Sequence, residues 1–176
     1  SLRALPGARE LLDYLTDAEI PWAIATSGRM ETAAVNLEIL GVDPALIPVV
    51  TRDQVKYAKP DPDLFLAAAE RLGVRIETAL VVGDSIWDML AATRCRALGV
   101  GLLSGGYGAD ELRQSGAIRV YDDPADLLRK IERAGMDPKT LEGGKPVACA
   151  LPGLCAGIGT EIAFACHHRV IADRSE

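Results

Sequence analysis

The sequence has few aromatic side chains: Phe, Trp and Tyr make up only 5% of its 176 residues. Its core must therefore be built mainly from aliphatic side chains. The chain is nonetheless 49% hydrophobic and 25% charged, a balance typical of globular proteins. Buried parallel strands are rich in Val, Ile and Leu, so this composition favours an α/β protein with a parallel sheet.

Positive charge is also in short supply. Nineteen Lys and Arg residues stand against 25 Asp and Glu residues, which gives a net charge of −6. No basic stripe appears, and we expect no nucleic-acid partner. No run of 18 apolar residues occurs, and we expect no membrane partner either. A phosphate group would have to be held locally, by one cation or by backbone N–H groups, and nothing indicates the oligomeric state.

The four cysteines form no Cys-x-x-Cys pair. They are Cys95, Cys149, Cys155 and Cys166. We interpret them as free thiols in a reducing compartment, which predicts a cytoplasmic protein. The chain begins at Ser1, without Met or a signal peptide, inside a helical pattern, and we expect this terminus to be a cut edge.

Segments with helical spacing alternate with short apolar runs over residues 1–134. Helices are predicted at 6–18, 29–40, 61–73, 85–95, 108–116 and 124–134, and strands at 20–26, 45–51, 78–84, 97–103 and 119–123. Gly41 and Gly73 are expected to end two helices, and Asp61 to cap one. Such alternation predicts an α/β fold, a Rossmann-like parallel sheet flanked by helices.

The remaining residues depart from this pattern. Residues 135–144 (GMDPKTLEGG) contain three Gly and one Pro, and we interpret them as a linker. Residues 145–176 are apolar and Gly-rich, unlike the body of the chain. They are predicted to form a separate unit with a strand at 146–151, a Gly-rich turn and a helix at 160–168.

Polar residues stand where the predicted strands end. Thr26, Ser27 and Gly28 follow the first strand, and Lys59 lies in the loop after the second. Ligands of parallel sheets bind beyond the carboxyl ends of the strands, so these residues should meet there. The Thr26 hydroxyl and the N–H groups of Ser27 and Gly28 can donate to phosphate oxygens, and Lys59 offers a compact positive charge.

Two carboxylates follow the third strand. Asp84 and Asp88 are four residues apart, which places both at one edge if the second lies on a helix. Hard oxygen ligands suit Mg²⁺, which takes one or two protein carboxylates and keeps several waters. Each of these features has a structural alternative. The Thr-Ser-Gly turn could be an ordinary helix start, Lys59 could be a solvated loop lysine, and the two carboxylates could be a helix cap and a surface charge. Their combination favours a phosphate site with Mg²⁺.

The order ATSG, AKPDPDLF and VVGDSIWD resembles motifs two, three and four of the haloacid dehalogenase-like (HAD) hydrolases. The branch it resembles contains phosphoglycolate phosphatase and β-phosphoglucomutase, and the resemblance covers residues 1–134. It implies catalytic roles for Lys59 and Thr26. It further implies phosphate binding by Thr26, Ser27, Gly28 and Lys59, and Mg²⁺ binding by Asp84 and Asp88.

The resemblance also implies a mechanism. An Asp-x-Asp-x-Thr/Ser motif supplies the nucleophile, which becomes an aspartyl-phosphate, and the general acid and base. No such motif stands before Thr26, and the Asp-Pro-Asp at 61–63 begins a helix. The first strand and the cap domain are absent too. We expect a Mg²⁺-dependent phosphatase of small phosphate esters by family, inactive as this chain alone, or alternatively a non-catalytic phosphate- and metal-binding scaffold.

Residues 145–170 resemble a second family, the crotonases (enoyl-CoA hydratases and isomerases). There Glu161 would match a catalytic Glu, and Ile158 would stand where an oxyanion-hole donor is expected. A fragment of an acyl-CoA hydratase or isomerase is therefore a further alternative. A fragment, a chimaera and a true fusion all fit this combination.

A missing first strand would leave its neighbours with unpaired edges, which is unfavourable. The apolar segment 146–151 (PVACAL) is a candidate to fill the gap between strands 20–26 and 78–84.

Overall fold

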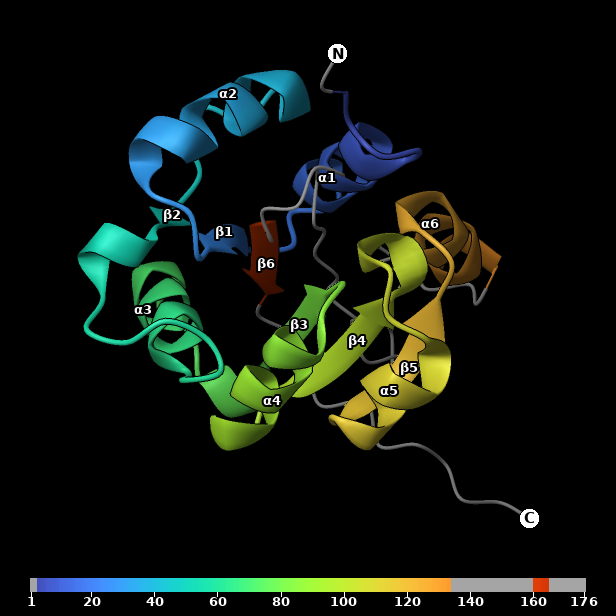
Figure 1. The fold of residues 1–176 in the computed structure, drawn as a ribbon. Helices are drawn as coiled ribbons and strands as arrows, with labels where there is room; N and C mark the ends of the chain where they lie inside the picture. The colour runs from blue at the N-terminus through green and yellow to red at the C-terminus, as the bar shows by residue number, and fades with distance from the viewer. Residues whose placement is uncertain (1–2, 134–159, 165–176) are drawn as a thin grey trace.

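The computed structural model describes residues 3–133 and 160–164, and their strands form one sheet. The order across the sheet is β2-β1-β6-β3-β4-β5 (Figure 1). The strands are β1 (Trp22–Thr26), β2 (Val49–Val50), β3 (Leu80–Gly83), β4 (Leu98–Leu102), β5 (Ala117–Tyr121) and β6 (Thr160–Phe164). The pairs β1–β2, β3–β4 and β4–β5 are parallel, while β6 is antiparallel to both neighbours.

Helices cover both faces of the sheet. They are α1 (Ala8–Asp17), α2 (Met30–Leu40), α3 (Asp63–Leu72), α4 (Ile86–Arg94), α5 (Ala109–Gln114) and α6 (Pro124–Arg133). Helices α1, α2 and α6 lie on one face, and α3, α4 and α5 lie on the other (Figure 1). The predicted α/β fold is confirmed, with its elements in the expected order.

The predicted ends of α2 and α3 are confirmed, whereas the predicted capping residue of α3 is wrong. Gly41 and Gly73 follow α2 and α3 with φ of 73° and 68°, a left-handed conformation that glycine adopts without strain. The predicted cap at Asp61 is wrong, because α3 begins at Asp63 after Pro62, with no side-chain cap. The fixed φ of Pro62 suits a helix entrance in place of a capping hydrogen bond.

The core has an aliphatic layer on each side of the sheet. Leu11 and Leu15 of α1 pack with Ile24 of β1 on one side, and Phe65 of α3 packs with Val81 of β3 on the other. All five side chains are fully buried. Each such burial contributes roughly 1.5–3 kcal/mol, so these two layers hold β1 and β3 in place.

The strand β6 fills the centre of the sheet. It pairs with all five residues of β1, from Trp22 opposite Phe164 to Thr26 opposite Thr160, and with two residues of β3. A gap between strands 20–26 and 78–84 is therefore filled, as expected. The expected occupant is wrong, because 160–164 lies there in place of 146–151, which falls outside the described residues, as does the predicted linker 135–144.

The helix predicted at 160–168 is also wrong for residues 160–164, which form a strand. The slot between β1 and β3 offers two rows of backbone N–H and C=O groups that need partners, and an extended segment satisfies both. The sequence Thr-Glu-Ile-Ala-Phe contains three good strand formers. Pairing with β1 and β3 therefore outweighs the weak helical preference of this segment.

No helix among the described residues is long and apolar enough to span a membrane. Cys95, at the end of α4, is a buried free thiol, and its burial raises its pKa. The other three cysteines lie outside the described residues.

Candidate active site

A buried ion pair forms the centre of the site. The Lys59 Nζ atom lies 3.0 Å from the Asp88 Oδ1 atom, and the two side chains are 3% and 0% exposed. Burial lowers the pKa of Lys59, while the nearby carboxylates of Asp88 and Asp84 act in the opposite direction. The pairing offsets part of the cost of removing both charges from water and fixes the ammonium at one place.

Asp88 is held in place by the first turn of α4. The N–H and the hydroxyl of Ser85 donate to Asp88 Oδ2 at 3.0 and 2.6 Å. This is a capping box, in which Ser85 also accepts from the Asp88 N–H. Both oxygens of Asp88 are thus engaged. The role of Ser85 was not foreseen, although the Ser-x-x-Asp spacing in the sequence was the signal for it.

Asp84 lies at the turn between β3 and α4, with only 9% of its surface exposed. Burial raises the pKa of Asp84 to about 6, and the negative charge of Asp88 adds to this shift while Lys59 opposes it. Gly105, in the loop after β4, packs directly on this residue. A Cβ at Gly105 would collide with the Asp84 carbonyl oxygen and lie 2.7 Å from its Cγ.

Gly83, the last residue of β3, packs closely against Asp88, as Gly105 does against Asp84. A Cβ at Gly83 would lie 2.6 Å from Asp88 Oδ2. The two carboxylates are therefore positioned by close backbone packing as well as by hydrogen bonds, and any side chain at these glycines would displace one of them.

Thr26 ends β1 and is almost fully buried. The Gly28 N–H donates to Thr26 Oγ1 at 3.0 Å, so this N–H orients the hydroxyl, whereas it was expected to point at a phosphate. Ser27, between them, is exposed. Thr26 and Gly83 end strands on either side of β6, about two strand spacings or 10 Å apart.

The donor set fits Mg²⁺ through one residue. Asp84 can supply a carboxylate oxygen, and hard oxygen ligands are what this ion prefers. Asp88, the second expected ligand, already accepts hydrogen bonds from Lys59 at Oδ1 and from Ser85 at Oδ2, and its coordination of the ion stays a prediction. Among the described residues, no group of three or more His, Cys, Asp or Glu side chains is placed to hold a metal ion.

Of the two site residues proposed in the tail, the structure describes one. Glu161 lies in β6 opposite Ala25 of β1, and not on the helix that the crotonase resemblance implies. Ile158 falls outside the described residues.

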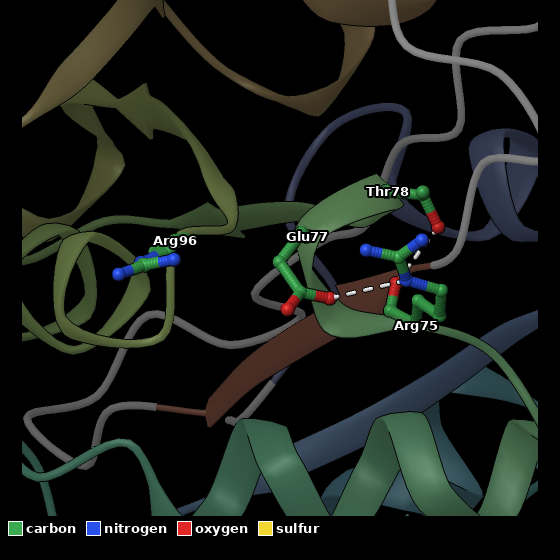
Figure 2. Close-up of a pocket in the computed structure, with 4 residues that line it drawn as sticks. All are labelled: Arg75, Glu77, Thr78 and Arg96. Atoms are coloured by element: carbon green, nitrogen blue, oxygen red, sulfur yellow. Dashed lines mark hydrogen bonds and ion pairs between the residues drawn. The ribbon is translucent and has the colours of Figure 1, made fainter.

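A cavity of about 350 Å³ lies near the amino ends of β3 and β4, opposite the ends that carry the site around Lys59 (Figure 2). Arg75, Glu77, Thr78 and Arg96 line it, in the segments that precede β3 and β4. Arg75 and Glu77 form an exposed ion pair of 3.7 Å. These segments enter the amino ends of their strands, so this cavity is separate from the site around Lys59.

Comparison with known proteins places the chain in a family. The haloacid dehalogenase-like hydrolases match residues 1–96, more than half of the sequence. The chain belongs to this family. Thr26, Lys59, Asp84 and Asp88 all lie in the matched part.

Particular relatives are phosphatases and a hydrolase. Hexitol phosphatase A of Escherichia coli (strain K12) is 42% identical over 101 residues, which cover 56% of this chain and 46% of the relative. Phosphoglycolate phosphatase of Rhodospirillum rubrum is 35% identical over 122 residues, or 69% of this chain and 50% of the relative. A solved hydrolase from Pseudomonas syringae is 58% identical with a TM-score of 0.72, covering 74% of this chain and 62% of that one.

These relatives confirm the resemblance to the branch that contains phosphoglycolate phosphatase. The chain spans about half the length of the curated relatives it matches.

Proposed function

We propose that the carboxyl edge of this sheet is the phosphate-ester site of a Mg²⁺-dependent phosphatase that works in the cytoplasm. The observation that carries this proposal is the buried ion pair of Lys59 and Asp88 beside the buried carboxylate of Asp84. A lysine held this way has little purpose in packing, because apolar side chains would fill the space at lower cost. Two relatives are named as phosphatases of a hexitol and of phosphoglycolate, which supports a small phosphate ester as substrate.

Each residue then has a separate task. Lys59 neutralises charge on the transferring phosphoryl group, and the Thr26 hydroxyl and Ser27 N–H hold its oxygens. Asp84 holds Mg²⁺, which when bound would offset repulsion between the phosphate and the carboxylates. Asp88 acts through its partner, since it fixes the direction of the Lys59 ammonium.

The 176 residues contain no Asp-x-Asp-x-Thr/Ser motif, so they carry no counterpart of the family's nucleophile. Loss of a nucleophile costs many orders of magnitude in rate. We therefore propose that this chain binds phosphate and Mg²⁺ but does not hydrolyse phosphate esters by itself. The same absence supports the second candidate, a binding scaffold without catalysis.

The test is hydrolysis of p-nitrophenyl phosphate, with and without Mg²⁺, by this chain and by a form extended at its amino terminus with an Asp-x-Asp segment. Turnover by the extended form alone, dependent on Mg²⁺, is the expected result. Activity of the shorter chain would contradict the role given to the missing motif. Inactivity of both, in forms that are folded, would favour the scaffold.

A further inference from the structure

The loop that carries Lys59 is attached to α4 at two places. Near the start of the helix, the Lys59 Nζ atom lies 3.0 Å from the Asp88 Oδ1 atom. At the end of the helix, the Arg94 Nη1 atom donates to the Pro60 carbonyl oxygen at 3.0 Å and lies 3.4 Å from the Asp61 Oδ1 atom. Because the helix rises 1.5 Å per residue, Asp88 and Arg94 are about 9 Å apart along its axis.

The two attachments act on different parts of the lysine. An ammonium on a flexible four-carbon stem is placed by its main chain as well as by its partner. Asp88 binds the tip of Lys59, whereas Arg94 binds the carbonyl oxygen of the residue that follows it. A hydrogen bond from a charged guanidinium is stronger than one between neutral groups. Arg94 therefore holds the main chain next to Lys59.

Further hydrogen bonds fold this loop onto itself and onto the start of α3. The Asp61 N–H donates to the Ala58 carbonyl oxygen at 3.0 Å, and the Tyr57 N–H donates to Asp63 Oδ2 at 3.1 Å. These bonds keep the shape of the loop but do not join it to α4. The guanidinium of Arg94 therefore fixes where the folded loop lies along the helix that carries Asp88.

Arg94 also has two ordinary roles. Its side chain and that of Asp61 are 50% and 48% exposed, and an exposed ion pair of this kind contributes little to stability. A cation in the last turn of a helix also interacts favourably with the helix dipole. Neither role needs the carbonyl of Pro60. The backbone contact is the observation that points to a further task.

We propose that Arg94 is a positioning residue for Lys59. Through the Pro60 carbonyl it keeps the main chain of the lysine where the ammonium reaches both Asp88 and the phosphoryl group. The inference rests on the proposed function, in which Lys59 neutralises charge on that group. A displacement of about 1 Å can cost on the order of 100-fold in rate, so a contact outside the site affects the reaction when it places a reacting side chain.

The first measurement is the rate at which acetic anhydride acetylates Lys59 in the full chain, read by mass spectrometry of its peptides. Lys59 is 3% exposed and should react slowly, and the exposed Lys56 is an internal reference. Arg94→Ala should raise the rate at Lys59 severalfold relative to Lys56, because the loop is released from α4. Arg113→Ala removes an exposed guanidinium paired with Asp110 near the end of α5, and this matched control should leave the ratio unchanged.

The second measurement is hydrolysis of p-nitrophenyl phosphate by the form extended with an Asp-x-Asp segment, with circular dichroism to show that each variant is folded. Arg94→Ala should lower kcat about tenfold, a part of the loss that displacement of Lys59 can cause. The same substitution should have no further effect in the Lys59→Ala background, since the group that it positions is gone. Arg113→Ala should keep the kcat of the unmodified protein.

Unchanged acetylation of Lys59 in Arg94→Ala would overturn this inference and leave the proposed function standing. An equal loss of kcat from Arg94→Ala with and without Lys59 would also overturn it, because Arg94 would then act on another group. Faster acetylation of Lys59 together with full kcat in Lys59→Ala would refute the task that the proposed function gives to Lys59, and would retain its attachment through Arg94.

Discussion

At the scale of single residues, burial of the Asp84 carboxylate lowers the free energy of unfolding by an amount that depends on pH. Its folded-state pKa of about 6 lies above the ordinary value of 3.8, so the folded chain holds this proton more tightly than the unfolded chain. Stability therefore falls as the pH rises from 4 through 6, and the loss is complete above 6. Two pKa units correspond to about 3 kcal/mol.

Asp84→Asn should remove this cost. We expect the variant to unfold at a higher temperature than the unmodified chain at pH 8 without Mg²⁺, and at a similar temperature at pH 4. Thermal unfolding followed by circular dichroism at the two pH values measures the difference. Asp110→Asn, at a carboxylate whose side chain is 88% exposed, is the control and should show no such pH dependence. A gain for Asp84→Asn of equal size at both pH values would contradict the assigned pKa.

Two nearby lysines allow a sharper test of the catalytic role. Lys59 is buried against Asp88, whereas Lys56 is exposed and lies 4.9 Å from the centre of the Tyr57 ring. In the extended form, Lys59→Ala should lower kcat on the order of 10²–10³-fold, the typical cost of losing one electrostatic stabiliser.

Lys56→Ala should leave kcat nearly unchanged, because its charge is solvated and outside the site. The measurement is steady-state hydrolysis of p-nitrophenyl phosphate, with circular dichroism to show that each variant is folded. Comparable rates for the two variants would remove Lys59 from the mechanism.

At the scale of elements, β6 is the part of the fold that depends most on its surroundings. A proline cannot donate to a sheet ladder and is excluded from central strands. Ile162→Pro should therefore detach β6 and speed hydrogen exchange of the backbone amides in Trp22–Thr26 and Leu80–Gly83. Ala109→Pro, at the first position of α5 where proline is favoured, is the control. Unchanged exchange in the Ile162 variant would mean that β6 does not occupy the slot.

Most elements could be predicted because their signals are local. Gly41 and Gly73 end helices through their own backbone conformation, and the apolar run before Thr26 forms a strand wherever it is buried. Residues 160–164 contain three strand formers, but this local signal is too weak to decide between a strand and a helix. Their state is decided by β1 and β3, which lie far away in the sequence, so a helix and a strand could not be told apart.

The candidate site divides in the same way. Thr26, Lys59, Asp84 and Asp88 could be found because each stands at a strand end or in the loop that follows. The contact of Gly105 with Asp84 could not be found, since it joins two loops through space and leaves no pattern in the sequence.

At the scale of the whole molecule, β6 joins the two halves of the sheet. The β1–β2 pair and the β3–β4–β5 sheet meet through β6 alone in the described strand order. A chain ended at Ala134 should therefore unfold at a lower urea concentration than the full chain and tend to associate through its exposed edges. Urea unfolding and gel filtration measure both effects, and equal midpoints would show that β6 adds no stability.

The register of β6 also has a consequence for the order in which the molecule folds. Trp22 pairs with Phe164, so the central ladder joins residues from near the two ends of the described chain. Contacts between such distant residues form slowly, because the entropy of closing a long loop is lost before the pairing compensates for it. We therefore expect the two halves of the sheet to assemble early from neighbouring segments, and insertion of β6 between them to be the slowest step of folding.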